Sequence, residues 1–318
     1  MPRKLAVHLI YDLLQYDLAL KPVDEELQRR GHQVIRSRTR AESSDGDCSV
    51  MIQDVAVAKA PGKRFFITHG LSCLKGWDIN LPIDYFLPAG PYWADRLSSK
   101  MQSDHFQFSI LEPTGWPRMD AWTALIAKRE SIRRSVIARH FLKDAPIVVY
   151  APTYKDPAKG HQRGVHAMTV ANLLSQQWNC FVLPHQMEKT HEFSGDDPRI
   201  IRRYGELRLD YLIAADVLVG DRSGLVFEFT ATGKPIVLID NPDHLNYTRL
   251  EANARGDVFD AGYWTTVERL IPTVTKALEH PGMKSDRIQY WRDQVVGPCD
   301  GQHAKRAVDQ IENAMWIA

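Results

Sequence analysis

The feature of the sequence that most constrains the fold is an alternation of short apolar runs with amphipathic segments, which occurs in two successive sets. In the first set, a helical pattern over Asp17–Arg30 ends at Gly31. The predicted strands of this set are Leu5–Ile10, Ser49–Ile52, Arg64–Thr68, Tyr85–Leu87 and Phe106–Leu111. Strands that alternate with helices favour βαβ units, so the first set predicts an α/β domain with a parallel sheet.

The same pattern restarts after a predicted helix over Asp120–His140 and a connecting segment, Lys143–Pro146. The predicted strands of the second set are Ile147–Tyr150, Cys180–Leu183, Val217–Val219 and Ile236–Ile239. A chain of 318 residues is long enough for two domains of ordinary size. We therefore predict two Rossmann-like domains, residues 1–142 and residues 143–318.

Composition and charge exclude several classes of protein. The formal net charge is +1 without a long run of one sign, whereas nucleic-acid binders usually carry a basic stripe. The four cysteines form no CxxC pair, which argues against a disulfide framework or a zinc site. No signal-peptide pattern occurs, nor an apolar run of the roughly 20 residues that span a bilayer. We expect a cytoplasmic protein without a nucleic-acid partner, and association with a membrane surface is compatible with this composition.

Residues suited to ligand binding follow several of the predicted strands. In open α/β sheets, ligands bind beyond the carboxyl ends of the strands. The segments in these positions are Thr68–Gly70, Gly115–Arg118, Pro152–Thr153, Pro184–His185 and Asp221–Gly224. Their placement predicts a binding site in the cleft between the two domains.

The segment Asp221-Arg222-Ser223-Gly224 lies between a predicted strand and a predicted helix. Free backbone N–H groups and the helix dipole at such a start favour an anion such as a diphosphate. A plain helix cap is the alternative, because Ser is a common N-cap residue. Glu228 lies one turn farther along, where its carboxylate could accept the hydroxyls of a ribose; an exposed helical acid is the alternative.

Two histidines and one arginine are candidates for the chemistry. His69 precedes Gly70, so a ligand could approach the backbone closely there, and an imidazole can act as a general base near neutral pH. His185 could donate to a phosphate oxygen, and Arg118 could clamp phosphate through its planar guanidinium. The alternatives are structural, hydrogen-bonded histidines and a solvated arginine.

Five blocks of the sequence, in order, resemble those of one known family. They are His69–Lys75, Gly115–Asp120, Tyr150–Asp156, Asp210–Pro235 and Asp300–Arg306. Together they are similar to the His-Gly segment, the Gly-aromatic-Pro-Arg-x-Asp and Ala-Pro-Thr blocks, the Ser-containing helix start and the Asp-Gly-x-x-Ala-x-Arg segment of the CDP-glycerol glycerophosphotransferase family. That family comprises polymerases and primases of teichoic acids and capsules. The sequence departs from the family pattern at Leu71, at Gly224 and at His185, which has Pro184 before it instead of a proline after it.

The resemblance implies a GT-B-like fold, in which two Rossmann-like domains face each other across a cleft. The N-terminal domain would hold the acceptor and the C-terminal domain the nucleotide donor, and the final helix could pack back on the N-terminal domain. It also implies transfer of glycerol phosphate, or a related polyol phosphate, from a CDP-linked donor to a hydroxyl of a cell-wall or capsule glycan or polymer, with release of CMP. A lipid-linked acceptor and peripheral attachment to the inner face of the cell membrane agree with this function.

The resemblance also assigns roles to the candidate residues. The catalytic residues would be His69, which takes the acceptor proton, and His185. The donor would be bound by Gly70, Arg118, Pro152, Thr153, Asp221, Arg222, Ser223, Gly224 and Glu228. No cofactor would be required and no residues are assigned to a metal, while the metal dependence of the reaction stays open. Two alternatives remain: a GT-B glycosyltransferase or 2-epimerase that uses a UDP-sugar, and an inactive nucleotide-binding member.

Overall fold

The computed structural model describes residues 4–10, 14–37, 46–52, 60–67, 71, 83–104, 108–152, 155–156, 161–162, 167–185, 197, 199–201, 206–221, 223–239 and 259–316. The chain divides into two units. The first unit comprises residues 1–71, 77–124 and 293–318, and the second comprises residues 72–76 and 125–292.

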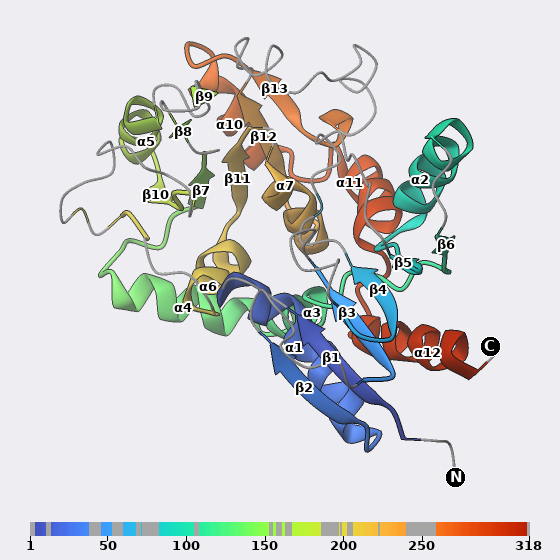
Figure 1. Ribbon diagram of the computed structural model, residues 1–318. Helices are drawn as coiled ribbons and strands as arrows, with labels where there is room; N and C mark the ends of the chain where they lie inside the picture. The colour runs from blue at the N-terminus through green and yellow to red at the C-terminus, as the bar shows by residue number, and fades with distance from the viewer. Residues whose placement is uncertain are drawn as a thin grey trace. The chain divides into compact units, whose positions relative to one another are not determined.

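The first unit contains a six-stranded parallel sheet in the order β2-β1-β3-β4-β5-β6 (Figure 1). Its strands are β1 (Ala6–Ile10), β2 (Gln33–Ser37), β3 (Cys48–Met51), β4 (Lys63–Ile67), β5 (Tyr85–Leu87) and β6 (Ser109–Ile110). Its helices are α1 (Leu14–Arg29), α2 (Pro91–Asp104), α3 (Met119–Ile126) and α12 (His303–Trp316), with a short π-helical segment η6 (Arg292–Val296) that begins at the end of the second unit. All four residues of β3 are buried, as expected for a parallel strand covered on both faces.

The second unit contains a five-stranded parallel sheet in the order β10-β7-β11-β12-β13. Its strands are β7 (Ile147–Ala151), β10 (Asn179–Val182), β11 (Val217–Gly220), β12 (Ile236–Ile239) and β13 (Tyr263–Thr265), and β8 (Lys155–Asp156) and β9 (His161–Gln162) form a separate antiparallel pair. Its helices are α4 (Arg129–Arg139), α5 (Ala167–Ser175), α6 (Glu206–Ala214), α7 (Gly224–Phe229), α10 (Leu270–Glu279) and α11 (Ser285–Trp291), with 3₁₀ turns η4 (Thr230–Thr232) and η5 (Phe259–Ala261). The central strands β7 and β11 are buried throughout, so the core of this unit lies on both faces of its sheet.

The structure confirms the predicted α/β class with two parallel sheets. Most predicted strands agree to within a residue. Of the predicted strand over Phe106–Leu111, residues 106 and 107 lie outside the described residues, and within residues 108–111 only Ser109–Ile110 form a strand, β6. The predicted helical segment Asp120–His140 is confirmed as helical, but it forms two helices, since α3 ends at Ile126 and α4 begins at Arg129. Between them the N–H of Lys128 donates to the carbonyl of Leu125, which closes a turn.

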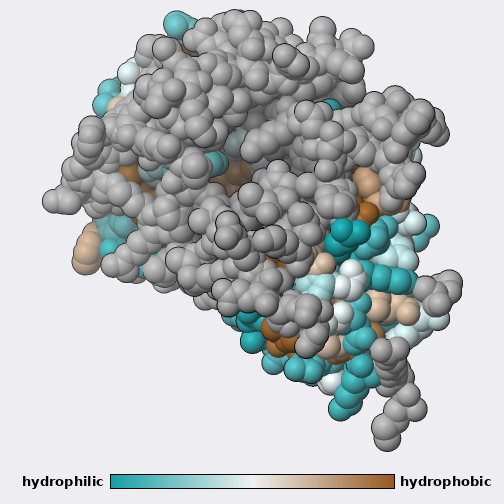
Figure 2. Space-filling model, in the orientation of Figure 1, coloured by the Kyte–Doolittle hydropathy of each residue, from teal (hydrophilic) through white to brown (hydrophobic). Residues whose placement is uncertain are grey.

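Among the described residues, no helix combines the length and the apolar character needed to cross a bilayer. At the lower right of Figure 2, where part of the first unit is drawn in colour, hydrophilic residues surround small groups of hydrophobic ones.

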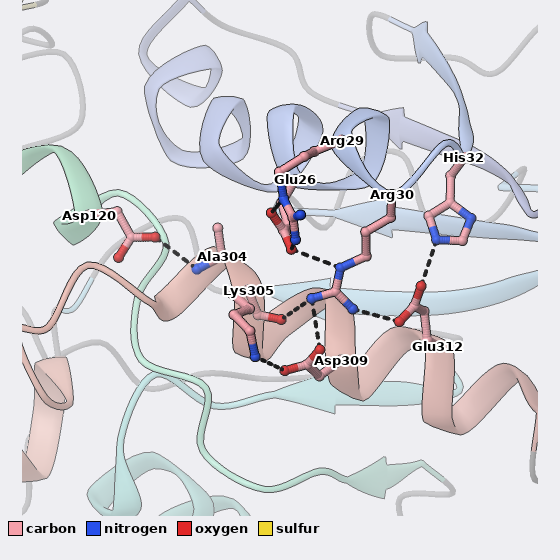
Figure 3. A network of polar contacts seen from close by, with 9 residues as sticks. All are labelled: Glu26, Arg29, Arg30, His32, Asp120, Ala304, Lys305, Asp309 and Glu312. Atoms are coloured by element: carbon pink, nitrogen blue, oxygen red, sulfur yellow. Dashed lines mark hydrogen bonds and ion pairs between the residues drawn. The ribbon is translucent and has the colours of Figure 1, made fainter. Parts of the chain in front are cut away.

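A network of ion pairs joins α12 to the end of α1 (Figure 3). The guanidinium of Arg30 contacts Glu26 at 2.8 Å, Asp309 at 2.7 Å and Glu312 at 2.6 Å. Glu312 also accepts from Nε2 of His32 at 2.8 Å, and the His32 side chain is 3% exposed. Charged groups that are this enclosed need partners, and the network supplies them from both helices. It therefore fixes the C-terminal helix on the first unit.

This network predicts a specific loss of stability in acid. Hydrogen bonds from Arg29, and from Arg30, lower the pKa of Glu26 from 4.5 to about 2. Because the pKa is lower in the folded state, the carboxylate stabilises the fold above its unfolded pKa, and this contribution is lost as the pH falls from about 4.5 toward 2. The full shift corresponds to at most about 3 kcal/mol, and screening at this partly exposed pair reduces it to roughly 1–2 kcal/mol.

We expect the melting temperature of Glu26→Gln, followed by circular dichroism, to depend less on pH than that of the unsubstituted protein in this acid range. Glu25→Gln is the matched control, because the Glu25 side chain is 67% exposed and lies on the same helix. Equal acid sensitivity of Glu26→Gln and the unsubstituted protein would contradict the assignment.

Candidate functional site

Three neighbouring strands of the second unit bring candidate residues to one edge of the sheet. Strands β10, β7 and β11 are adjacent and parallel. Their registers pair Val182 with Tyr150, and Ala151 with Gly220, so the three strands end at nearly the same level. The residues that follow these ends are Leu183 to His185, Pro152 and Asp221. This is the edge at which parallel α/β sheets bind ligands.

His185 is held at this edge by the backbone on either side of the preceding proline. The N–H of Leu183 donates to the carbonyl of Tyr150 at 2.8 Å, which continues the ladder past the end of β10. The carbonyl of Pro184 accepts from the Arg208 guanidinium of α6 at 2.8 Å. His185 itself is half-buried, so its imidazole belongs to an ordered segment and retains access to solvent.

Ser223 occupies the N-cap position of α7, with φ −87° and ψ 156°, but its side chain makes no capping hydrogen bond. The N–H of Val226 instead donates to the Ser223 carbonyl at 3.2 Å. Ser223 therefore lies at the predicted helix start and in the N-cap position that the alternative of a plain cap also expects, without a hydrogen bond from its side chain. Both Ser223 and Gly224 are half-buried.

Glu228 is buried, with 6% of its surface exposed, so the alternative of an exposed helical acid is wrong. The physical reason is the packing of α7: Val226, Phe227, Glu228 and Phe229 are all buried, which leaves this part of the helix without a solvent face. Asp221 is also buried, at 9% exposed. Burial of carboxylates is costly unless they are paired or hydrogen-bonded, so such residues are common at functional sites.

In the first unit, Arg118 lies in the connection between β6 and α3, on the carboxyl side of the sheet. Its guanidinium lies over the ring of Trp116, 5.5 Å from the centroid. Trp116 is 1% exposed, and its backbone N–H donates to the carbonyl of Val296 at 3.1 Å. Gly115 has a φ of +79°, a conformation that favours glycine. Arg118 is therefore carried by an ordered loop and is not a freely solvated charge.

Four of the predicted site residues, His69, Gly70, Thr153 and Arg222, lie outside the described residues, and their roles stay predictions. Sequence reasoning also did not connect the Gly115–Asp120 block with the C-terminal Asp300–Arg306 block. The structure does so: the N–H of His303 donates to the Asp120 carboxylate at 3.0 Å. No signal in the sequence links these distant blocks.

Two cysteines of the described chain, Cys48 and Cys180, are deeply buried. Burial raises the pKa of the Cys48 and Cys180 thiols to about 12, so both stay protonated and are poor nucleophiles at neutral pH. Within the described ranges, no three His, Cys, Asp or Glu side chains lie together as a metal site would require.

Comparison with known proteins places this arrangement in a family. The sequence model of the CDP-glycerol:poly(glycerophosphate) glycerophosphotransferase family matches residues 83–313. Among curated proteins, the chain is 25% identical over 250 residues to a teichoic acid poly(glycerol phosphate) polymerase of Bacillus spizizenii, covering 72% of this chain and 59% of the relative. It is 24% identical over 214 residues to a teichoic acid poly(ribitol-phosphate) polymerase of the same organism, covering 62% of this chain and 33% of the relative. The chain thus spans between one third and about three fifths of the length of these relatives.

Two kinds of solved structure share the fold. A variant of the wall teichoic acid polymerase TagF aligns with a TM-score of 0.69 and 16% identity, over 98% of this chain and 89% of that chain. The UDP-GlcNAc 2-epimerase of Neisseria meningitidis aligns with a TM-score of 0.62 and 13% identity, over 97% of this chain and 100% of that chain. These similarities establish a GT-B-like fold. Since the family match extends over most of the sequence, the chain belongs to the CDP-glycerol:poly(glycerophosphate) glycerophosphotransferase family.

Proposed function

We propose that the chain transfers glycerol phosphate, or a related polyol phosphate, from a CDP-linked donor to a hydroxyl group of a cell-wall or capsule polymer. The observation that carries this proposal is the convergence of Pro152, His185 and Asp221 on one sheet edge in a member of this family. The names of the relatives favour glycerol phosphate and ribitol phosphate as the groups to test first. A TagF variant has also been solved after soaking with CDPG, which favours a cytidine nucleotide as the donor.

In the proposed reaction, an acceptor oxygen attacks the phosphorus that carries the polyol. A new P–O bond forms, the bond to the bridging oxygen of the diphosphate breaks, and CMP leaves with the electron pair. His69 takes the proton of the attacking hydroxyl. Such transfers depend mainly on positioning and on stabilisation of charge on the phosphoryl oxygens.

The donor is proposed to lie at the edge formed by β10, β7 and β11. His185 and the segment Asp221–Gly224, which includes Arg222, would contact the diphosphate. Pro152 and Thr153 would line the nucleotide, and Glu228 would accept the ribose hydroxyls. Arg118 would contribute its planar guanidinium to phosphate, and Gly70 would let the substrate approach the backbone beside His69.

No resident metal ion or organic cofactor is assigned to this reaction. The cationic and N–H groups named above would hold the diphosphate charge directly. Transfer is therefore expected to persist at the same rate after chelation with EDTA.

The test is a thermal-shift panel of the purified protein with CDP-glycerol, CDP-ribitol, CMP, UDP-sugars and GDP-sugars. A ligand that binds only the folded state adds to the free energy of unfolding, by about 2.7 kcal/mol when its concentration is 100 times its dissociation constant. This added stability raises the melting temperature. We expect shifts with the cytidine ligands, followed by CMP release when a polyol-phosphate polymer is added with the effective donor. Shifts with uridine ligands alone would overturn the donor and indicate a UDP-sugar enzyme. Cytidine binding without CMP release from any acceptor would indicate an inactive nucleotide-binding member.

A further inference from the structure

The loop that carries Arg118 is held by the start of α12, far away in the sequence. The carboxylate of Asp120 accepts a hydrogen bond from the backbone N–H of His303 at 3.0 Å. It accepts a second one from the backbone N–H of Ala304 at 2.9 Å (Figure 3). These are N–H groups of the first turn of α12, which have no partner within the helix. Asp120 therefore caps α12 and joins the helix to the end of the Arg118 loop.

The His303 ring makes a second, more specific connection to this loop. The ring is fully buried, and Nδ1 donates to the carbonyl of Trp116 at 2.9 Å while Nε2 donates to the carbonyl of Pro298. A carbonyl oxygen can only accept, so in each of these contacts it is the ring nitrogen that donates. The Asp120 carboxylate lies 3.5 Å from Nδ1 of the same ring.

The loop backbone is shaped to receive this ring. Gly115 lies against His303, and a Cβ atom at Gly115 would overlap the ring. Beside it, the Arg306 guanidinium donates from Nε to the carbonyl of Thr114 at 2.8 Å and forms a two-point ion pair with Asp300 at 2.8 and 3.1 Å. The charged groups that face His303 are thus Asp120 of α3, Asp300 of the preceding loop and Arg306 of α12.

We infer that His303 is a positioning residue for the transfer reaction, which, with Arg306, fixes the backbone of residues 114–118 and thereby aims the Arg118 guanidinium. The connection is short: His303 holds the Trp116 carbonyl, and the Arg118 side chain stacks on the Trp116 ring. A displacement of about 1 Å in such a group can slow a reaction roughly 100-fold. The inference rests on the proposed function in one respect, the assignment of Arg118 to the donor phosphate.

Two nearly isosteric substitutions separate the two ring contacts. The side-chain amide of His303→Asn can take the place of Nδ1 and still donate to Trp116, whereas that of His303→Gln can take the place of Nε2 and donate only to Pro298. We expect kcat/KM of His303→Gln to fall about 100-fold and that of His303→Asn to recover at least about tenfold of this loss. The same order is expected in hydrogen exchange of the Trp116 amide, which should exchange faster in His303→Gln than in His303→Asn.

One control variant and one alternative variant accompany the two His303 substitutions. His32→Gln changes a buried histidine that also contacts α12, but at Glu312, so it should lower stability without changing kcat/KM below the melting temperature. If both His303 variants fail to fold, Arg306→Lys provides the test, because it keeps the charge but loses the directed contact with Thr114. We expect that variant to lose about tenfold in kcat/KM and to show faster exchange of the loop amides.

Equal kcat/KM of His303→Asn and His303→Gln would overturn the inference, as would unchanged hydrogen exchange of the Trp116 amide in His303→Gln. If Arg306→Lys is the test, unchanged kcat/KM together with unchanged exchange of the loop amides would overturn it. Hydrogen exchange needs no substrate, so it is decisive even if the proposed function fails. Absence of CMP release from the unsubstituted protein, with the expected exchange pattern intact, would reject the proposed function and leave the role of His303 in fixing the loop in place.

Discussion

Replacement of His69 by alanine is expected to slow polyol-phosphate transfer by about 10²–10⁴-fold, the usual contribution of a general base. The physical reason is that a neutral hydroxyl is a weak nucleophile, and proton removal during attack lowers the barrier. In the sequence, His69 lies two residues after Ile67, the last residue of β4. Because the imidazole is proposed to contact the acceptor hydroxyl, the affinity for the CDP-linked donor should change little.

The measurement is steady-state CMP release at saturating donor, together with calorimetric titration of the donor. His280→Ala is a suitable control, since it removes an exposed histidine outside the proposed site. A rate for His69→Ala within threefold of the unsubstituted rate, roughly 0.6 kcal/mol in the barrier, would reject His69 as the base. Loss of donor affinity instead of turnover would move His69 to the donor side of the site.

Glu228→Gln is expected to weaken donor binding by about 10–100-fold, because a hydrogen bond to a charged group contributes roughly 1.5–3 kcal/mol. A carboxylate can accept from both ribose hydroxyls, whereas the amide of glutamine retains only one accepting atom. The substitution keeps the shape of the side chain, which matters because Glu228 is only 6% exposed within a buried helix.

Calorimetric titration with CMP and the donor should show this loss, while the turnover number at saturating donor stays within a few-fold. Glu279→Gln serves as the matched control, since Glu279 is exposed at the end of α10 in the same unit. The melting temperature of each variant without ligand separates a binding effect from a folding effect. Undiminished affinity of a folded Glu228→Gln protein would place the ribose elsewhere.

The sheet strands were predictable because their local chemistry is unambiguous. The strand β12 was predicted with its observed bounds, Ile236–Ile239, since four β-branched or aliphatic residues follow a turn at Gly233–Pro235. Gly233 indeed has a φ of +67°. The break between α3 and α4 was missed because no proline or glycine marks it, and only a turn at Lys128 separates the two helices.

The candidate site was predictable at the level of strand ends and not at the level of contacts. Parallel pairing requires residues after β10, β7 and β11 to share an edge, so the grouping of His185 with Asp221 follows from the strand pattern alone. Burial of Glu228 does not follow, because it depends on what surrounds α7. The contact of Gly115 with His303 is equally hidden, since it joins residues nearly 190 positions apart, and only the fold of the chain places them together.

The division of the chain has a consequence for its synthesis on the ribosome. The first unit is discontinuous: residues 293–318 return to it after residues 125–292 have formed the second unit. Helix α12 packs against α1, so the face of α1 that it covers stays uncovered until His303–Trp316 have emerged. Domains generally fold as they leave the ribosome. The second unit can therefore fold co-translationally before the first unit, which contains β1 to β6, is complete. A nascent chain that stalls before residue 293 exposes a first unit without helix α12 to chaperones.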